Sequence, residues 1–182
     1  MTFPILWLTG NSGAGKTTLA EAFEKYWNTR PSDDHPWSRR VLVLDGDEMR
    51  ATVSTEDSLS ADDRRKHNLR VARLAALMQK KGFLVVVAVI APFASVRHEI
   101  SLLCKPQWIY IKRSGLSAAD RPYEAPKHPA HIIDNDILSK KEALMELLAY
   151  MKGYETGTFM KKEKQTMKAA VGSHFLSPEF KN

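Results

Sequence analysis

The sequence predicts an α/β fold, a three-layer α/β/α sandwich with a mainly parallel five-stranded sheet. Five apolar segments read as strands, with amphipathic stretches between them, and this alternation is typical of a parallel sheet covered on both faces. The uninterrupted apolar run 85–90 favours a central strand buried on both sides. A glycine-rich turn at 10–17 joins the first strand to the first helix. The expected strands are 3–9, 41–45, 83–90, 107–112 and 130–133.

The helices are predicted from apolar stripes and from their first residues. Ser60 is a candidate N-cap, because a serine side chain accepts a hydrogen bond from the first turn. Ser139 with Glu142 forms a capping-box pattern. The stripes recur at i, i+3, i+4 and i+7: Leu19, Ala22, Phe23 and Tyr26 in one helix, and Leu144, Leu147, Leu148 and Met151 in another.

Length and composition indicate one globular domain with a short extension. The chain has 182 residues, enough for a sizeable core, and we assign 1–152 to the domain and 153–182 to a basic extension. The extension is interpreted either as a partly helical segment used in packing or homodimer formation, or as a solvated basic tail. The net charge of +6 is compatible with an acidic ligand and equally with a generally basic surface.

The chain is expected to be cytoplasmic. Its longest apolar run, 84–92, is too short to span a bilayer, and no cationic region precedes the first strand as in a secretory signal. Cys104 is the only cysteine, which excludes an internal disulfide framework. The basic residues are not interleaved with aromatic residues as in a nucleic-acid motif. We therefore expect no membrane and no nucleic-acid partner.

A complete phosphate-binding loop follows the first strand and identifies the fold as that of the P-loop NTPases. Glycines let the backbone curl around phosphate oxygens, and the following helix presents its positive end to the same anion. Lys16 would reach the β- and γ-phosphates of ATP, and Thr17 would ligate Mg²⁺. The alternative, a chance glycine-rich turn, does not explain strand, motif and helix in succession. The nucleotide-binding residues are Gly10, Asn11, Ser12, Gly13, Ala14, Gly15, Lys16, Thr17 and Thr18.

Two carboxylates, Asp45 and Asp47, follow the second expected strand. Ligands bind at the carboxyl ends of parallel strands, so both are candidate catalytic residues together with Lys16. One carboxylate would hold hydrated Mg²⁺, for which we assign Asp45 with Thr17, while the other orients or deprotonates the attacking hydroxyl. An ordinary Asp-Gly-Asp turn is the alternative.

A basic helix beginning after Ser60 supplies candidate contacts to the phosphate acceptor. Arg64 and Arg65 share a helical face with Asn68. Arginine forks suit a phosphate or sulfate, and the amide suits a sugar or base. A solvated basic face is the alternative reading.

The motifs together resemble the adenylyl-sulfate (APS) kinases. The resemblance spans about residues 5–150 and rests on the phosphate-binding loop, Leu-Asp-Gly-Asp-x-x-Arg, the Ser-x-x-Asp-Arg…Asn helix, Ile-x-Pro-Phe and Pro-Tyr-Glu-Ala-Pro. It implies transfer of the γ-phosphate of ATP to the 3′-hydroxyl of a small nucleotide acceptor, adenylyl sulfate. It also implies a base-like role for Asp47, and acceptor contacts from Arg50, Arg65, Asn68, Ile90, Pro92 and Phe93.

The chain departs from this family in ways that leave the acceptor open. Ala91 stands where the family has a serine, and Leu116 where a phenylalanine stacks on the acceptor's adenine. The long basic lid after the fourth strand is almost absent, so Lys112, Arg113 and Arg121 are candidate replacements for its cations. The segment from Leu59 to Asn68 is one residue longer than usual, so Arg64 and Arg65 compete for one role.

Two alternatives to adenylyl sulfate phosphorylation follow from these departures. The first is a kinase of another nucleotide, such as the cytidine diphosphoramidate kinases, which are similar in sequence to APS kinases. The second is a non-catalytic ATP-binding scaffold. Lys16, Thr17 and both carboxylates are retained, which favours catalysis, because binding alone does not need paired carboxylates.

Overall fold

The computed structural model describes residues 3–31, 38–116 and 122–155. Five strands form one sheet in the order β2-β3-β1-β4-β5, with every neighbouring pair parallel. This confirms the predicted fold and all five strands, whose observed bounds are β1 Ile5–Thr9, β2 Val41–Asp45, β3 Leu84–Ala88, β4 Gln107–Lys112 and β5 His131–Asp134.

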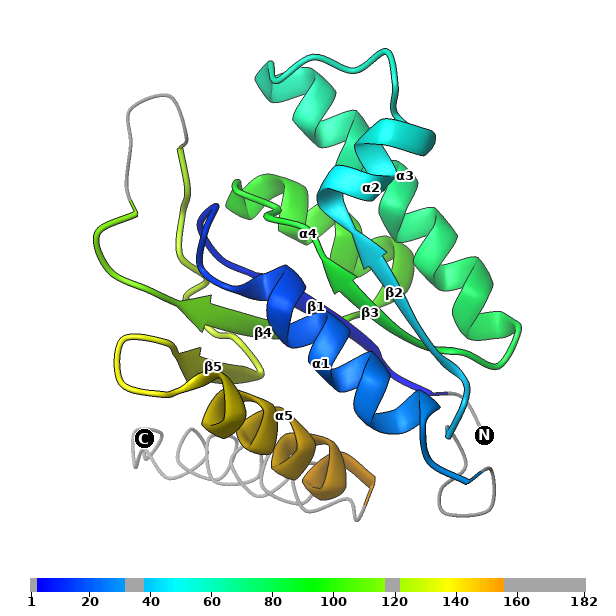
Figure 1. The fold of residues 1–182 in the computed structure, drawn as a ribbon. Helices are drawn as coiled ribbons and strands as arrows, with labels where there is room; N and C mark the ends of the chain where they lie inside the picture. The colour runs from blue at the N-terminus through cyan, green and yellow to red at the C-terminus, as the bar shows by residue number, and fades with distance from the viewer. Residues whose placement is uncertain (1–2, 32–37, 117–121, 156–182) are drawn as a thin grey trace, which may run out of the picture. The chain divides into compact units, whose positions relative to one another are not determined.

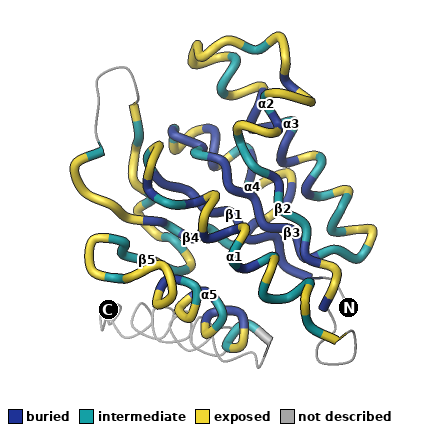
Figure 2. The backbone as a smooth tube through the Cα atoms, in the orientation of Figure 1, coloured by how far each residue is buried: buried dark blue, intermediate teal, exposed yellow. Residues whose placement is uncertain are grey.

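Helices cover both faces of the sheet. Helix α1 (Lys16–Asn28) lies on one face, while α3 (Ala61–Lys80) and α4 (Ala94–Cys104) pack together on the other (Figure 1). The short α2 (Gly46–Thr52) follows β2 directly. Every residue of β1 and β3 is buried, whereas the helices alternate buried and exposed residues (Figure 2). The two central strands therefore form the floor on which the loops at their carboxyl ends are built.

The core on the α3/α4 face also fixes the end of β3. Trp7 is fully buried and its Nε1 donates to the Val89 carbonyl at 2.9 Å. Thr9, also fully buried, donates through Oγ1 to the Ile90 carbonyl at 2.6 Å. These two long-range bonds hold the segment after β3 against β1, so Ile90 is placed next to the loop that leaves β1.

The sequence signals for the helix starts are confirmed. Ser60 caps α3, accepting from the Asp63 N–H. At α5 (Lys140–Glu155), Ser139 and Glu142 exchange the two bonds of a capping box: Glu142 N–H to Ser139 Oγ at 3.3 Å and Ser139 N–H to Glu142 Oε2 at 2.8 Å.

The chain divides into two compact units, 1–145 and 146–182. The first contains the sheet. Of the second, the structure describes only the end of α5, so the predicted boundary at 152 and the basic extension stay predictions, and the extension after 155 lies outside the described residues. No helix in the described part of the chain has the length and apolar character needed to cross a bilayer.

Candidate active site

The phosphate-binding loop connects the buried end of β1 to α1. Gly13 and Gly15 have φ of +79° and +100°, values that side chains of L-residues adopt only with strain, and Gly15 occupies the N-cap of α1. A Cβ on Gly15 would lie 2.9 Å from Nδ2 of Asn135. Glycine is therefore required both by the backbone conformation and by the amide that closes over it.

Side chains from outside the loop hold its carbonyl groups. Asn135, which follows β5, donates through Nδ2 to the Ala14 carbonyl at 2.7 Å. Arg113, which follows β4, donates to the Gly13 carbonyl at 3.2 Å. Sequence reasoning did not assign Asn135 to the site, because its contact is with a residue 121 positions away.

Lys16 lies within the loop, with its ammonium on the carbonyls of Gly10 and Asn11 at 3.0 and 2.8 Å. Burial lowers its pKa from 10.5 to about 8, while the charges of Asp45 and Asp47 raise it in part. The ammonium is thus a poorly solvated cation, which gives it a strong interaction with any anion that enters the loop.

Thr17 and Asp45 form the pair that fits Mg²⁺. Thr17 Oγ1 donates to Asp45 Oδ2 at 2.7 Å, and the other carboxylate oxygen of Asp45 accepts from the Asp47 N–H at 2.9 Å. The carboxylate is fixed by α2 on one side and faces the threonine hydroxyl on the other. Mg²⁺ is commonly held by one or two protein oxygens, with phosphates and water completing its octahedron, so this donor set fits the ion.

One cavity of about 340 Å³ joins the phosphate-binding loop to the segment after β2 and to α3. Its lining includes Lys16 and Thr17 of the loop, Asp45 and Asp47 where β2 ends and α2 begins, and the arginines Arg50 and Arg64. Burial lowers the pKa of Arg50, as does the neighbouring charge of Arg64. Two guanidinium groups that repel each other suit an anionic ligand between them. The remaining lining residues are Asn11, Ser12, Gly13, Gly46, Leu59, His67, Ala88, Val89, Ile90, Pro92, Pro122 and Tyr123.

The loop also lines a second cavity of about 660 Å³. This cavity shares Lys16 and Thr17 with the first, and its other lining residues include Asn135, Leu138 and Ala143. The two cavities therefore meet at the same lysine and threonine, which is the arrangement required if two ligands react across that point.

Comparison with known proteins identifies the family. The family model of adenylylsulphate kinase matches residues 3–113. The chain is 31% identical to the adenylyl-sulfate kinase of Bacillus pumilus over 173 residues, covering 81% of this chain and 84% of that protein. The chain belongs to the adenylyl-sulfate kinase family.

Other members and solved structures agree with this assignment. A probable adenylyl-sulfate kinase of Archaeoglobus fulgidus is 29% identical, over 72% of this chain and 96% of that protein. The structure of an APS kinase from Mycobacterium tuberculosis has the same fold, with a TM-score of 0.67 and 24% identity over 83% of this chain and 98% of that one. The predicted family and its phosphotransferase class are thus confirmed.

The structure brings most of the residues predicted from this family into the first cavity. Arg50, Arg64, Ile90 and Pro92 line it together with the catalytic candidates. Three other predicted acceptor contacts are not among its lining residues. Arg65 forms two hydrogen bonds with Glu99 of α4, at 2.8 and 2.5 Å. Asn68 donates to the Arg64 carbonyl within α3 at 2.7 Å, and Phe93 packs against the core at the N-cap of α4.

Tyr123 is a cavity residue that sequence reasoning did not assign. Its hydroxyl lies 3.1 Å from Thr9 Oγ1, and its ring stacks on Tyr110. Burial raises its pKa to about 12, so it is an uncharged phenol. The Glu124 N–H donates to the Pro92 carbonyl at 2.9 Å. The Pro-Tyr-Glu motif was noted only as a family signature; these contacts make it a wall of the cavity.

The structure describes the position of Ala91 and part of the segment after β4. Ala91 is fully buried with φ of +45°, and its carbonyl accepts from Arg97 at 2.7 Å. Of the candidate replacement cations, Lys112 pairs with Asp134 at 2.5 Å and Arg113 contacts the phosphate-binding loop. Arg121 and the rest of the short connector, 117–121, lie outside the described residues.

Proposed function

We propose that this chain transfers the γ-phosphate of ATP to the 3′-hydroxyl of adenylyl sulfate, with Mg²⁺ bound at the phosphates. The observation that carries the proposal is the 340 Å³ cavity that joins Lys16 and Thr17 to Asp47, Arg50 and Arg64. A terminal phosphate at Lys16 and an acceptor anion at the arginines would leave the acceptor's ribose beside Asp47. Phosphoryl transfer depends mainly on such positioning and on charge stabilisation.

The donor nucleotide would extend from the loop into the second cavity. Lys16 would contact the β- and γ-phosphates, and Asn135 with Arg113 would keep the loop in shape around them. Mg²⁺, held by Thr17 and Asp45, would neutralise the charge that develops on the transferred group. Leu138 and Ala143 supply apolar surface to this cavity.

The acceptor nucleotide would occupy the first cavity. Asp47, whose backbone is fixed by its bond to Asp45, would orient the ribose hydroxyl and accept its proton. Arg50 and Arg64 would hold the anionic phosphosulfate. Leu59, Ile90 and Pro92 supply apolar surface to the first cavity.

A second candidate acceptor is cytidine diphosphoramidate. It is favoured because the match to the family model ends at Arg113, where the family lid is shortened. The apolar side chains Leu59 and Leu116, the latter 3.6 Å from a Cβ built on Gly13, offer no ring for stacking on a purine. Stacking on an aromatic side chain is worth about 1–3 kcal/mol per base in nucleic-acid sites, so its loss favours a smaller base.

A cytoplasmic homodimer completes the proposal. Cys104 is a free, buried thiol, as in proteins of a reducing compartment. The APS kinase of Thiobacillus denitrificans, 28% identical over 82% of this chain, is described as hexameric, which supports self-association within the family. Light scattering on the purified chain measures the assembly directly.

The test of function is turnover with Mg·ATP and adenylyl sulfate, followed by release of ADP and by the mass of the product. A product heavier by one phosphoryl group supports the proposal. ATP binding without a phosphorylated product from adenylyl sulfate, cytidine diphosphoramidate or ordinary nucleoside monophosphates would favour the non-catalytic scaffold instead.

A further inference from the structure

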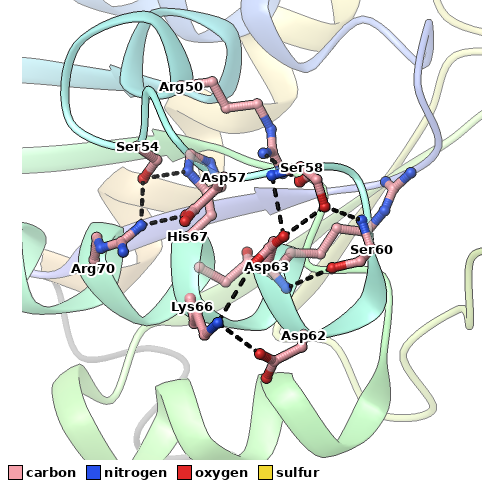
Figure 3. Close-up of polar contacts among 12 residues, drawn as sticks. Arg50, Ser54, Asp57, Ser58, Ser60, Asp62, Asp63, Lys66, His67 and Arg70 are labelled. Carbon is pink, nitrogen blue, oxygen red and sulfur yellow. Dashed lines mark hydrogen bonds and ion pairs between the residues drawn. The ribbon is translucent and has the colours of Figure 1, made fainter.

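His67 is a buried histidine on the cavity-facing side of α3. Its side chain has no exposed surface and lines the first cavity with Arg50 and Arg64. Nδ1 lies 3.1 Å from Ser54 Oγ, in the connector between α2 and α3 (Figure 3). Nε2 is buried and has no hydrogen-bond partner within the described residues. A buried polar atom without a partner is uncommon in native proteins and calls for an explanation.

The surroundings of the ring set its charge and give one of its two nitrogens a hydrogen-bond partner. Burial, and next the charge of Arg50, lower the pKa of His67 to about 4, so the ring is neutral and carries one proton. Arg70, which also pairs with Asp57, donates to Ser54 Oγ at 3.3 Å. When Ser54 Oγ, which accepts from Arg70, donates its own proton to Nδ1, the ring proton lies on Nε2, which is then a donor.

We propose that the Nε2–H of His67 donates to an anionic oxygen of the acceptor nucleotide and is a specificity-determining group of this site. Only an acceptor that offers an oxygen at this point satisfies the buried N–H. An acceptor without one leaves it unpaired, and sites of this kind reject such analogues strongly.

The class of ligand group follows from the neighbours. Two arginines beside the same cavity attract a sulfuryl or phosphoryl group, whose oxygens are acceptors only. A neutral donor in the same cavity lining adds a hydrogen bond without adding a third positive charge. His67 therefore recognises the sulfuryl or phosphoryl group of the acceptor. The identity of that acceptor as adenylyl sulfate rests on the proposed function.

Two substitutions separate this role from a structural one. His67→Asn keeps a polar atom near Nδ1, and hence the contact with Ser54, but has nothing at the position of Nε2. His67→Gln reaches the position of Nε2 and gives up the contact with Ser54. We expect His67→Asn to lower kcat/KM for the acceptor by about tenfold or more, as for a lost hydrogen bond to a charged group, with KM for ATP unchanged. His67→Gln should retain more acceptor use.

The reverse order would overturn the proposal: a His67→Asn enzyme that works like wild type, with His67→Gln impaired, would make the ring only an anchor for Ser54. His98→Asn and His98→Gln, on the exposed face of α4, control for the loss of a histidine and should leave both kinetic constants unchanged.

Imidazole ¹⁵N NMR tests the same inference without turnover. The wild-type ring should be the Nε2–H tautomer, and inorganic sulfate should shift its Nε2 resonance. A proton on Nδ1, or no response to sulfate because an ordered water already satisfies Nε2, would refute the role of His67. If the wild type fails to phosphorylate adenylyl sulfate, the proposed function falls, while this measurement still decides the assignment of His67.

Discussion

The choice between Arg64 and Arg65 gives the sharpest prediction about the acceptor end of the site. The family resemblance suggests Arg65, but Arg65 is bound to Glu99 of α4, while Arg64 lines the cavity. Arg64 Nε donates to the Leu59 carbonyl at 2.7 Å, which fixes the side chain. Within the described residues its terminal nitrogens have no protein partner, and they are therefore available to an anion.

The expected effect of Arg64→Ala follows from the loss of this contact. A hydrogen bond to a charged group is worth about 1.5–3 kcal/mol, and about 1.4 kcal/mol corresponds to tenfold, so kcat/KM for the acceptor should fall by about 10- to 150-fold. KM for ATP should hardly change. Arg64→Lys, which keeps the charge and loses the fork, should fall between the two.

Arg65→Ala is the matched control, because it removes the same charge from the next position on the same helix. Its ion pair with Glu99 is exposed, and such pairs contribute little, so acceptor kinetics should equal those of the wild type. The assay is steady-state turnover at saturating Mg·ATP with the acceptor varied. An Arg65→Ala enzyme that loses acceptor use, beside an active Arg64→Ala enzyme, would refute the placement of the clamp.

Three further predictions concern the loop and the cavity wall. Because burial lowers the Lys16 pKa to about 8, raising the pH above 8 removes the charge of Lys16 and should weaken ATP binding by up to about tenfold per pH unit. Calorimetry of ATP binding should show no such pH dependence for Lys16→Met. A wild-type affinity that does not change with pH would contradict the assignment of Lys16. Gly15→Ala incurs about 1–2 kcal/mol of backbone strain and displaces Asn135, so it should lose ATP affinity. Gly115→Ala, with φ of +71° and open space around its Cβ, should lose stability only. Tyr123→Phe removes the contact with Thr9 and should cost about 0.5–1.5 kcal/mol in denaturant unfolding; an unchanged midpoint would show that the hydroxyl contributes nothing.

Local pattern was enough to predict the sheet and the phosphate-binding loop. These signals depend only on residues a few positions away in the sequence: the valine run of β3, the glycines of the loop, and the caps Ser60 and Ser139. For that reason each could be predicted without knowledge of the tertiary structure. Asp45 could be assigned because ligands bind at the carboxyl ends of parallel strands, and Asp45 is the last residue of such a strand.

The rest of the site depends on contacts between distant elements. Arg65 differs from Arg64 only because Glu99 of another helix lies within reach, and no spacing along α3 contains that information. Asn135 and Tyr123 reach the site from 121 and 114 residues away. His67 resembles any core histidine in sequence; its role depends on which of its nitrogens Ser54 engages.

The proposed function requires that one cavity bring the γ-phosphate of ATP to the ribose hydroxyl of adenylyl sulfate. The most direct measurement is a competition, with adenylyl sulfate and cytidine diphosphoramidate at equal concentration, Mg·ATP in excess, and the products quantified by mass. The ratio of products gives the ratio of kcat/KM values. We expect 3′-phosphorylated adenylyl sulfate to predominate. A predominance of the phosphorylated cytidine nucleotide would contradict the proposed function and assign the shortened lid to a change of acceptor.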